Sequence, residues 1–214
     1  MTRLSPLTRS SNLFARAITV LREEGIKSFW FKSLSEMGYR RYLLLERLLD
    51  DPIPHTEPRV PITIDLLKKT EAEEYSMFRA EVRRSEIIDR IDSGHWCFVA
   101  RHRGKIISVT WATANMTVRS YYLNREIRLG QDEVYTYASF TEPDFRGLSV
   151  SPALKVEIMR HFRSAGYRRM ICWVLPENSS SLKALQKVGF HPLGMMGYIR
   201  VGPWRKDFYR VINP

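Results

Sequence analysis

The chain has 214 residues, of which 44% are hydrophobic and 27% are charged, a composition that excludes a collagen-like, low-complexity or wholly disordered protein. It contains 34 Lys and Arg against 23 Asp and Glu, and the resulting net charge of +11 favours an anionic ligand or partner. Two cysteines and no stretch of about 18 apolar residues argue against a disulfide framework, a four-ligand zinc site and a membrane span, so we expect a cytoplasmic protein.

The first part of the chain has a helical pattern. Apolar residues spaced close to 3.6 apart predict two helices in residues 1–50, the second continuing through Leu48. Four prolines in residues 51–61 cannot continue a helix and bias their neighbours toward extended conformations. We therefore predict an N-terminal helical extension over residues 1–50, a Pro-rich linker over 51–61 and a main domain over 62–214.

Strands and helices alternate after the linker. The predicted elements are strands at 62–67, 96–102, 106–114, 120–129, 133–141, 169–175, 191–195 and 198–212, and helices at 70–83, 85–91, 152–164 and 179–188. A meander of antiparallel strands followed by alternating strands and helices predicts a mixed α/β sheet.

A loop of small residues, Arg-Gly-Leu-Ser-Val-Ser at 146–151, joins a predicted strand to a predicted helix. Its small side chains let the backbone approach a ligand closely. The start of the next helix supplies unpaired N–H groups and the positive end of a dipole, which together bind anions. Taken alone, the pattern is more typical of a tight connection without a ligand.

Two runs together resemble a known superfamily. The run 143–151, Pro-Asp-Phe-Arg-Gly-Leu-Ser-Val-Ser, resembles the acyl-CoA loop of the GNAT (GCN5-related N-acetyltransferase) superfamily. The later run 178–190, which begins Asn-Ser-Ser-Ser and ends Gly-Phe, looks like the second motif of that superfamily. The resemblance covers residues 61–212. It implies a mixed, mainly antiparallel GNAT-like sheet flanked by helices, and the transfer of an acyl group from acyl-CoA to a primary amine.

The resemblance also implies where the cosubstrate, acetyl-CoA or another acyl-CoA, binds. Backbone N–H groups of the 146–151 loop would hold the pyrophosphate, the end of the preceding strand would pair with the pantetheine arm, and Asn178 would contact that arm. No metal is implied. The implied cofactor-binding residues are Phe140, Thr141, Arg146, Gly147, Leu148, Ser149, Val150, Ser151 and Asn178.

Two features depart from the pattern of the superfamily. Ser149 and Ser151 replace the central glycines of the loop, and Ser149 is unfavourable if its φ is positive. Many members carry a tyrosine general acid seven residues after the motif asparagine, where this chain has Leu185. Leucine cannot donate a proton, so another residue or water would protonate the thiolate that leaves.

Glu133 is the candidate catalytic base. An ungapped comparison places it where histone-type members carry their catalytic glutamate, and a carboxylate there would take a proton from an ammonium directly or through water if burial raises its pKa. The alternative is a solvent-facing glutamate beside the turn at Gly130. Tyr135 and Tyr137 share a strand face with Glu133, where they line the acceptor cleft or simply pack, and Tyr137 is the candidate proton donor.

The remaining candidate groups and partners are less specific. The acceptor is expected to be a small-molecule amine. Aromatic and basic residues occur together at 27–32 and 40–45, which suits docking of the N-terminal helices on an anionic membrane or an acyl carrier protein. Packing of their apolar face on the sheet or in a homodimer is the favoured interpretation. Four histidines without partners at metal or triad spacing are interpreted as structural: His95, His102, His161 and His191.

Three other functions remain to be weighed. N-acyl amino acid synthases of the superfamily take long acyl chains from acyl carrier protein, and the basic surface and extra helices make this an alternative. A CoA-binding member without catalysis is a second alternative, because of Ser149 and Leu185. Nucleic-acid binding is disfavoured, since the sequence has no zinc pattern, RNP motif or helix-turn-helix motif.

Overall fold

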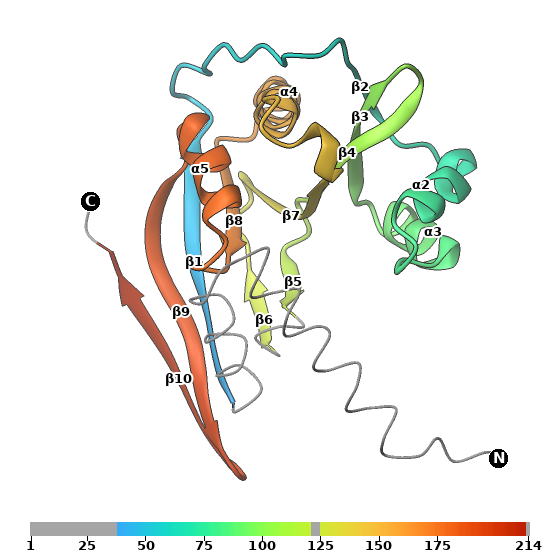
Figure 1. Cartoon of the computed structure of the whole chain (residues 1–214). Coiled ribbons are helices and arrows are strands. Elements are labelled where there is room, and N and C mark those ends of the chain that lie inside the picture. Colours follow the sequence, from blue (N-terminus) through green and yellow to red (C-terminus); the bar gives the residue numbers. More distant parts are fainter. Residues whose placement is uncertain (1–37, 121–124, 213–214) are drawn as a thin grey trace, which may run out of the picture.

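The structure of the protein is a computed structural model and describes residues 38–120 and 125–212 (Figure 1). Its helices and strands, in chain order, are β1 (Tyr39–Leu48), β2 (Thr63–Leu66), a 3-10 turn (Lys69–Glu71), α2 (Ala72–Phe78), α3 (Arg84–Asp92), β3 (Trp96–His102), β4 (Lys105–Thr113), β5 (Thr117–Ser120), β6 (Arg125–Arg128), β7 (Glu133–Thr141), a second 3-10 turn (Pro143–Phe145), α4 (Val150–Ser164), β8 (Arg169–Val174), α5 (Ser179–Lys187), β9 (His191–Val201) and β10 (Trp204–Val211).

Within these residues, an eight-stranded sheet has the order β10-β9-β1-β8-β7-β4-β3-β2. Each pair of neighbours is antiparallel except β7 and β8, which are parallel. A separate hairpin pairs β5 with β6. The prediction of a mixed, mainly antiparallel sheet is confirmed.

Helices cover both faces of the sheet. Successive residues of its central strands point to opposite faces, and the residues on each face are apolar, so each face is buried under helices. On β3, Phe98 is buried in the main core with Phe162 of α4. Its neighbour Val99 is buried in a second cluster with Tyr75 of α2 and Ile87 of α3. The pair α4 and α5 thus lies on one face, and the pair α2 and α3 lies on the other (Figure 1).

The predicted second helix is wrong over residues 39–48, which form β1. This strand lies between β8 and β9 and pairs with both (Figure 1). Leu44 and Leu45 are 9% and 1% exposed and are buried in different clusters on opposite faces of the sheet. A strand covered on both faces has a continuous apolar run, which in a sequence resembles a buried helix. The rest of the predicted extension, residues 1–37, lies outside the described residues.

The segment predicted as a linker, residues 51–61, contains no helix or strand but is packed against the sheet domain. Ile53 and Val60 pack on the main core. The backbone N–H of Arg59 donates to the carbonyl oxygen of Leu148 at 2.8 Å. This segment, which follows β1 in the chain, is therefore held against the loop that precedes α4.

The largest differences between the predicted and the observed boundaries lie in three places. The single strand expected over 120–129 is two strands, β5 and β6, that pair with each other. The last two strands meet at Gly202, whose φ is +58°, and not before Tyr198. The helix expected over 70–83 is a 3-10 turn at Lys69–Glu71 followed by α2, which begins at Ala72 and ends at Phe78.

Both cysteines of the chain lie in its described part. Cys97 and Cys172 are both buried free thiols. Burial raises the pKa of Cys172 to about 12, so this thiol stays protonated. Among the described helices, none is both long and apolar enough to cross a lipid bilayer.

Candidate active site

β7 and β8 pair along only the first part of β7. The pairing runs from Glu133 opposite Arg169 to Thr136 opposite Cys172. Soon after, the register between β4 and β7 shifts, and Ala138 has a φ of +47°, which together mark a β-bulge. Among the described strands, none pairs with the β8-facing edge of β7 beyond this point, so an extended ligand can add to that edge as a strand would.

A groove of about 850 Å³ lies beside the end of β7, the loop at 146–151 and the start of α5. All but one of the residues predicted to bind CoA line this groove: Phe140, Thr141, Arg146, Gly147, Ser149, Val150, Ser151 and Asn178. The exception, Leu148, is partly buried against the main core. The fold therefore brings together two motifs that are far apart in the sequence.

The loop at 146–151 turns its backbone with two left-handed residues. Gly147 has a φ of +77°, and Ser149 has a φ of +60° and a ψ of 16°. Ser149 therefore adopts the conformation in which glycine is favoured. No side chain caps the N-terminus of α4, which leaves the positive end of the helix facing the groove.

Basic side chains surround this helix start. Arg146 donates from Nε to the carbonyl oxygen of Thr141 at 3.1 Å, and Lys187 donates from Nζ to Oγ of Ser149 at 2.8 Å. Lys183, on α5, is exposed and also lines the groove. Cations and a helix N-terminus at one end of a groove fit a dianionic pyrophosphate.

A buried lysine, which the sequence reasoning missed, also lines the groove. Lys155 is 6% exposed and donates from Nζ to Oγ of Ser151 at 3.1 Å. Burial lowers its pKa, and the nearby Cys172 opposes this shift. Its position between the buried residues Leu154 and Val156 was the signal in the sequence that could have identified it.

A second cavity, of about 570 Å³, lies where α3 approaches β7. Its walls include the aromatic side chains of Tyr42, Tyr135, Tyr137 and Trp173, and the polar groups of Glu86, Asp89, Arg90, Ser93 and His95. The rings of Tyr135 and Trp173 lie 4.3 Å apart, and those of Tyr135 and Tyr137 lie 5.5 Å apart and are stacked. Ala138 lines this cavity and its neighbour Ser139 lines the groove, so both spaces reach the bulge of β7.

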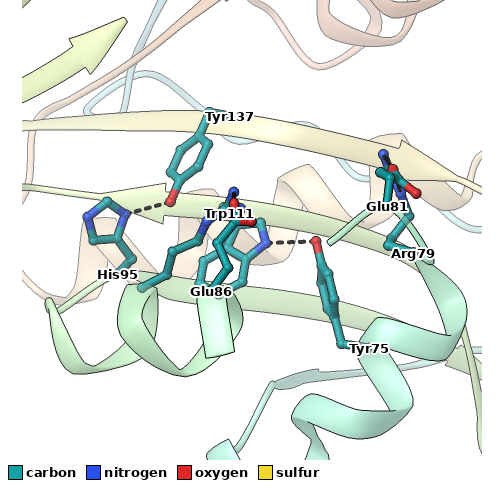
Figure 2. Close-up of polar contacts among 8 residues, drawn as sticks. Tyr75, Arg79, Glu81, Glu86, His95, Trp111 and Tyr137 are labelled. Carbon is teal, nitrogen blue, oxygen red and sulfur yellow. Dashed lines mark hydrogen bonds and ion pairs between the residues drawn. The ribbon is translucent and has the colours of Figure 1, made fainter. Parts of the chain in front are cut away.

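Tyr137 points from β7 toward His95, at the wall of this cavity (Figure 2). Its Oη lies 2.5 Å from Nδ1 of His95. Burial raises the pKa of Tyr137 far above its usual value, so the hydroxyl is protonated at neutral pH. Burial, together with the nearby charge of Arg90, lowers the pKa of His95, so the imidazole is neutral at neutral pH. The interpretation of His95 as merely structural overlooked this contact, because 42 residues separate the pair in the sequence.

Glu133 lines neither the groove nor the cavity. Its Oε2 accepts a hydrogen bond from the N–H of Gly130 at 2.8 Å, and its Oε1 accepts one from Arg169 at 2.6 Å. Arg169 also pairs with Glu46 at 2.6 Å, and His191 contacts the same glutamate at 3.1 Å. A catalytic base at Glu133 stays a prediction, and in this geometry it would act through water.

Leu185 stands where the resemblance places a tyrosine acid in many members. It is 2% exposed and belongs to the main core. The proton for a leaving thiolate must therefore come from another group or from water.

Comparison with protein families gives one matching model, described as the acetyltransferase (GNAT) family, over residues 63–190. No curated protein matches the chain. The solved structures that resemble it include a GCN5-related N-acetyltransferase from Sphaerobacter thermophilus, with a TM-score of 0.56 and 14% identity over 87% of this chain and 58% of that one.

Two further similar structures are named for their substrates or ligands. One is the GCN5-related glucosamine N-acetyltransferase region of a fungal multi-domain β-N-acetylglucosaminidase, with a TM-score of 0.55 and 16% identity over 86% of this chain. The present chain spans only 22% of that fungal protein. The other is AAC(6')-Iy bound to the bisubstrate analogue CoA-S-monomethyl-acetylneamine, with a TM-score of 0.51 and 22% identity over 68% of this chain and 98% of that one. At these identities the similarity establishes the fold alone.

Proposed function

Because the chain belongs to the acetyltransferase (GNAT) family, we propose that it transfers an acyl group, most simply acetyl, from acyl-CoA to a primary amine of a small molecule. One observation carries the proposal beyond the family. The groove that fits CoA and the cavity walled by aromatic and polar side chains both reach the β7 bulge. A thioester in the first and an amine in the second would therefore meet at one point, which is the requirement for direct attack.

In this proposal the loop at 146–151 and the start of α4 hold the pyrophosphate, while Phe140 and Thr141 pair with the pantetheine arm. Asn178 is suited to contact that arm with its amide nitrogen. Its Oδ1 already accepts a hydrogen bond from the N–H of Ser181 at 3.1 Å, where it caps α5. That contact fixes the orientation of the side chain.

The chemistry we propose is attack of the neutral amine on the thioester carbonyl, without a covalent enzyme intermediate. A backbone N–H at the bulge of β7 would stabilise the charge that develops on the carbonyl oxygen. Tyr137 would protonate the departing thiolate, and Glu133 would accept a proton from the ammonium form of the acceptor through water. Asp89, at the wall of the cavity, would attract a cationic acceptor, whereas Glu86 at the same wall is already paired with Arg90.

A CoA-binding protein without catalysis is the second candidate, and the burial of Leu185 favours it. The N-acyl amino acid synthase alternative depends on docking of an acyl carrier protein by N-terminal helices. Residues 39–48 of the second predicted helix form β1, and the rest of the predicted helices lies in residues 1–37, outside the described part of the chain.

Calorimetry with acetyl-CoA and longer acyl-CoAs, followed by a screen of amine acceptors that detects the free thiol, tests these functions. Binding with amine-dependent thiol release supports the transferase. Binding of acyl-CoA without thiol release in the presence of any amine supports the non-catalytic candidate. Preference for a long acyl chain delivered by acyl carrier protein supports the synthase, and absence of CoA binding contradicts the other two candidates.

A further inference from the structure

We infer that His95 and Asn115 are positioning residues, which direct the hydroxyl proton of Tyr137 into the acceptor cavity. The inference rests on the proposed function. It starts from a chain of contacts that joins a loop after β4, the start of β3 and the middle of β7. Figure 2 shows its central contact, between His95 and Tyr137.

The orientation of the Asn115 amide is fixed first. Its Nδ2 lies 3.2 Å from the carbonyl oxygen of Ser93, to which it donates a hydrogen bond. Its backbone N–H donates to Oγ1 of the buried Thr113 at 3.2 Å, which anchors the residue at the end of β4. Rotating the amide by half a turn would bring Oδ1 against the Ser93 carbonyl, where two acceptors would face each other. The amide nitrogen of Asn115 therefore faces both the carbonyl oxygen of Ser93 and the imidazole of His95.

The amide orientation then fixes the tautomer of His95. The same Nδ2 lies 3.2 Å from Nε2 of His95, and because an amide nitrogen only donates, Nε2 must accept. The imidazole is neutral and has one N–H, which is consequently on Nδ1. Nδ1 lies 2.5 Å from Oη of Tyr137 and donates to it. The opposite tautomer would set the Nε2 proton against the amide protons of Asn115.

The tautomer in turn directs the hydroxyl of Tyr137. Since His95 donates to Oη, the hydroxyl proton cannot lie on the line between them. It is then available to the adjoining cavity, which Tyr137 lines. The guanidinium of Arg90 lies 5.8 Å from the ring centroid of Tyr137 and is paired with Glu86, and no carboxylate hydrogen-bonds to Oη among the described residues.

This arrangement gives a balanced proton transfer. As the new C–N bond forms and the C–S bond breaks, the sulfur takes the hydroxyl proton of Tyr137. The phenolate that results is stabilised by the Nδ1–H of His95 and by the charge of Arg90. It regains a proton from the nitrogen of the former amine, which must lose one to become an amide. Tyr137 thus ends as it began, and His95 neither gains nor loses a proton.

The tautomer can be tested without any activity. Two-bond 15N–1H correlation spectra of the full chain distinguish an imidazole protonated at Nδ1 from one protonated at Nε2, and His95→Gln identifies the signal. We expect His95 to be protonated at Nδ1 above pH 7, and Asn115→Ala to shift it toward Nε2. A wild-type His95 protonated at Nε2 would overturn the inference, whether or not the protein is an acyltransferase.

Kinetics test the consequence. His95→Leu removes the donor to Tyr137, and we expect kcat to fall at least about tenfold with an unchanged KM for acetyl-CoA. His95→Asn, whose amide nitrogen replaces Nδ1, should recover most of this loss. In a Tyr137→Phe background, His95→Leu should have no further effect, because its role acts through that hydroxyl. His55→Leu, at an exposed histidine on residues 51–61, is the matched control.

The outcomes distinguish failure of the proposed acyl transfer from failure of the positioning role of His95. A wild-type protein that transfers no acyl group to any amine rejects the proposed function and leaves the tautomer measurement standing. A transferase in which His95→Leu keeps its kcat, or in which the two substitutions lower kcat independently, rejects the positioning role and leaves the function standing.

Discussion

Lys187 donates a hydrogen bond of 2.8 Å from Nζ to Oγ of Ser149, the residue held at a φ of +60°. The contact joins the last turn of α5 to the loop ahead of α4, and so connects two walls of the groove. A serine in this conformation costs about 1 kcal/mol relative to glycine, and the lysine contact offsets part of that cost.

We expect Ser149→Leu to weaken CoA binding more than tenfold in calorimetry, because a bulky side chain blocks access to the backbone N–H groups of the loop. The matched variant Ser149→Gly relieves the strain and should bind CoA as the wild type does. Its free energy of unfolding should equal that of the wild type or exceed it by up to about 1 kcal/mol. Undiminished affinity in the leucine variant would remove this loop from the CoA site.

Tyr137→Phe should lower kcat by roughly 10²- to 10⁴-fold, the range for loss of a general acid, and leave the KM for acetyl-CoA nearly unchanged. Tyr135→Phe is the control, since it removes a hydroxyl from the neighbouring stacked ring on the same strand face. Equal kcat values for the two variants in steady-state assays would show that Tyr137 is not the proton donor.

Glu133→Gln should lower kcat while CoA affinity stays nearly intact, because it alters proton acceptance and hardly alters shape. The variant also weakens the ion pair with Arg169, which the control Arg169→Gln removes from the other side. If Glu133 is the base, only the glutamate variant loses kcat. Thermal destabilisation of both variants, with wild-type kcat across pH 6–9, would assign Glu133 a structural role.

Lys155→Met should stabilise the protein at neutral pH. The pKa of Lys155 is lowered by burial in the folded state, whereas an unfolded lysine has a pKa of about 10.4. Below that pH the unfolded chain takes up a proton that the folded state resists, so Lys155 costs stability at pH 7. The cost falls as the pH rises from the lowered folded pKa toward about 10.4, and it is absent above that pH. Urea unfolding should show a gain at pH 7 that vanishes near pH 11, with no gain for the exposed Lys183→Met.

Deletion of residues 1–51 should give an insoluble product. It removes β1, leaves β8 and β9 without the strand between them, and exposes the cores that Leu44 and Leu45 fill. Deletion of residues 1–37 keeps β1 and is therefore the informative truncation for docking on vesicles or acyl carrier protein. A soluble, CoA-binding product of the longer deletion would show that β1 is dispensable.

The sequence alone determined the features that neighbouring residues encode. The loop at 146–151 and the capping Asn178 lie at helix starts, where a few adjacent residues set the backbone path, and their resemblance to a known superfamily predicted residues that line one groove. The strands at 96–102 and 133–141 have the predicted bounds, because their patterns are bordered by turn residues.

Tertiary structure decided the rest, because it depends on pairing between distant segments. Whether the apolar run at 39–48 is a helix or a strand is settled by the two strands that pair with it, since only they satisfy its backbone hydrogen bonds. The contact of His95 with Tyr137 follows from the registers of three strands, β3 on β4 and β4 on β7. A strand pattern in a sequence specifies which side chains share a face, but the partner across the sheet is fixed only when the strands align.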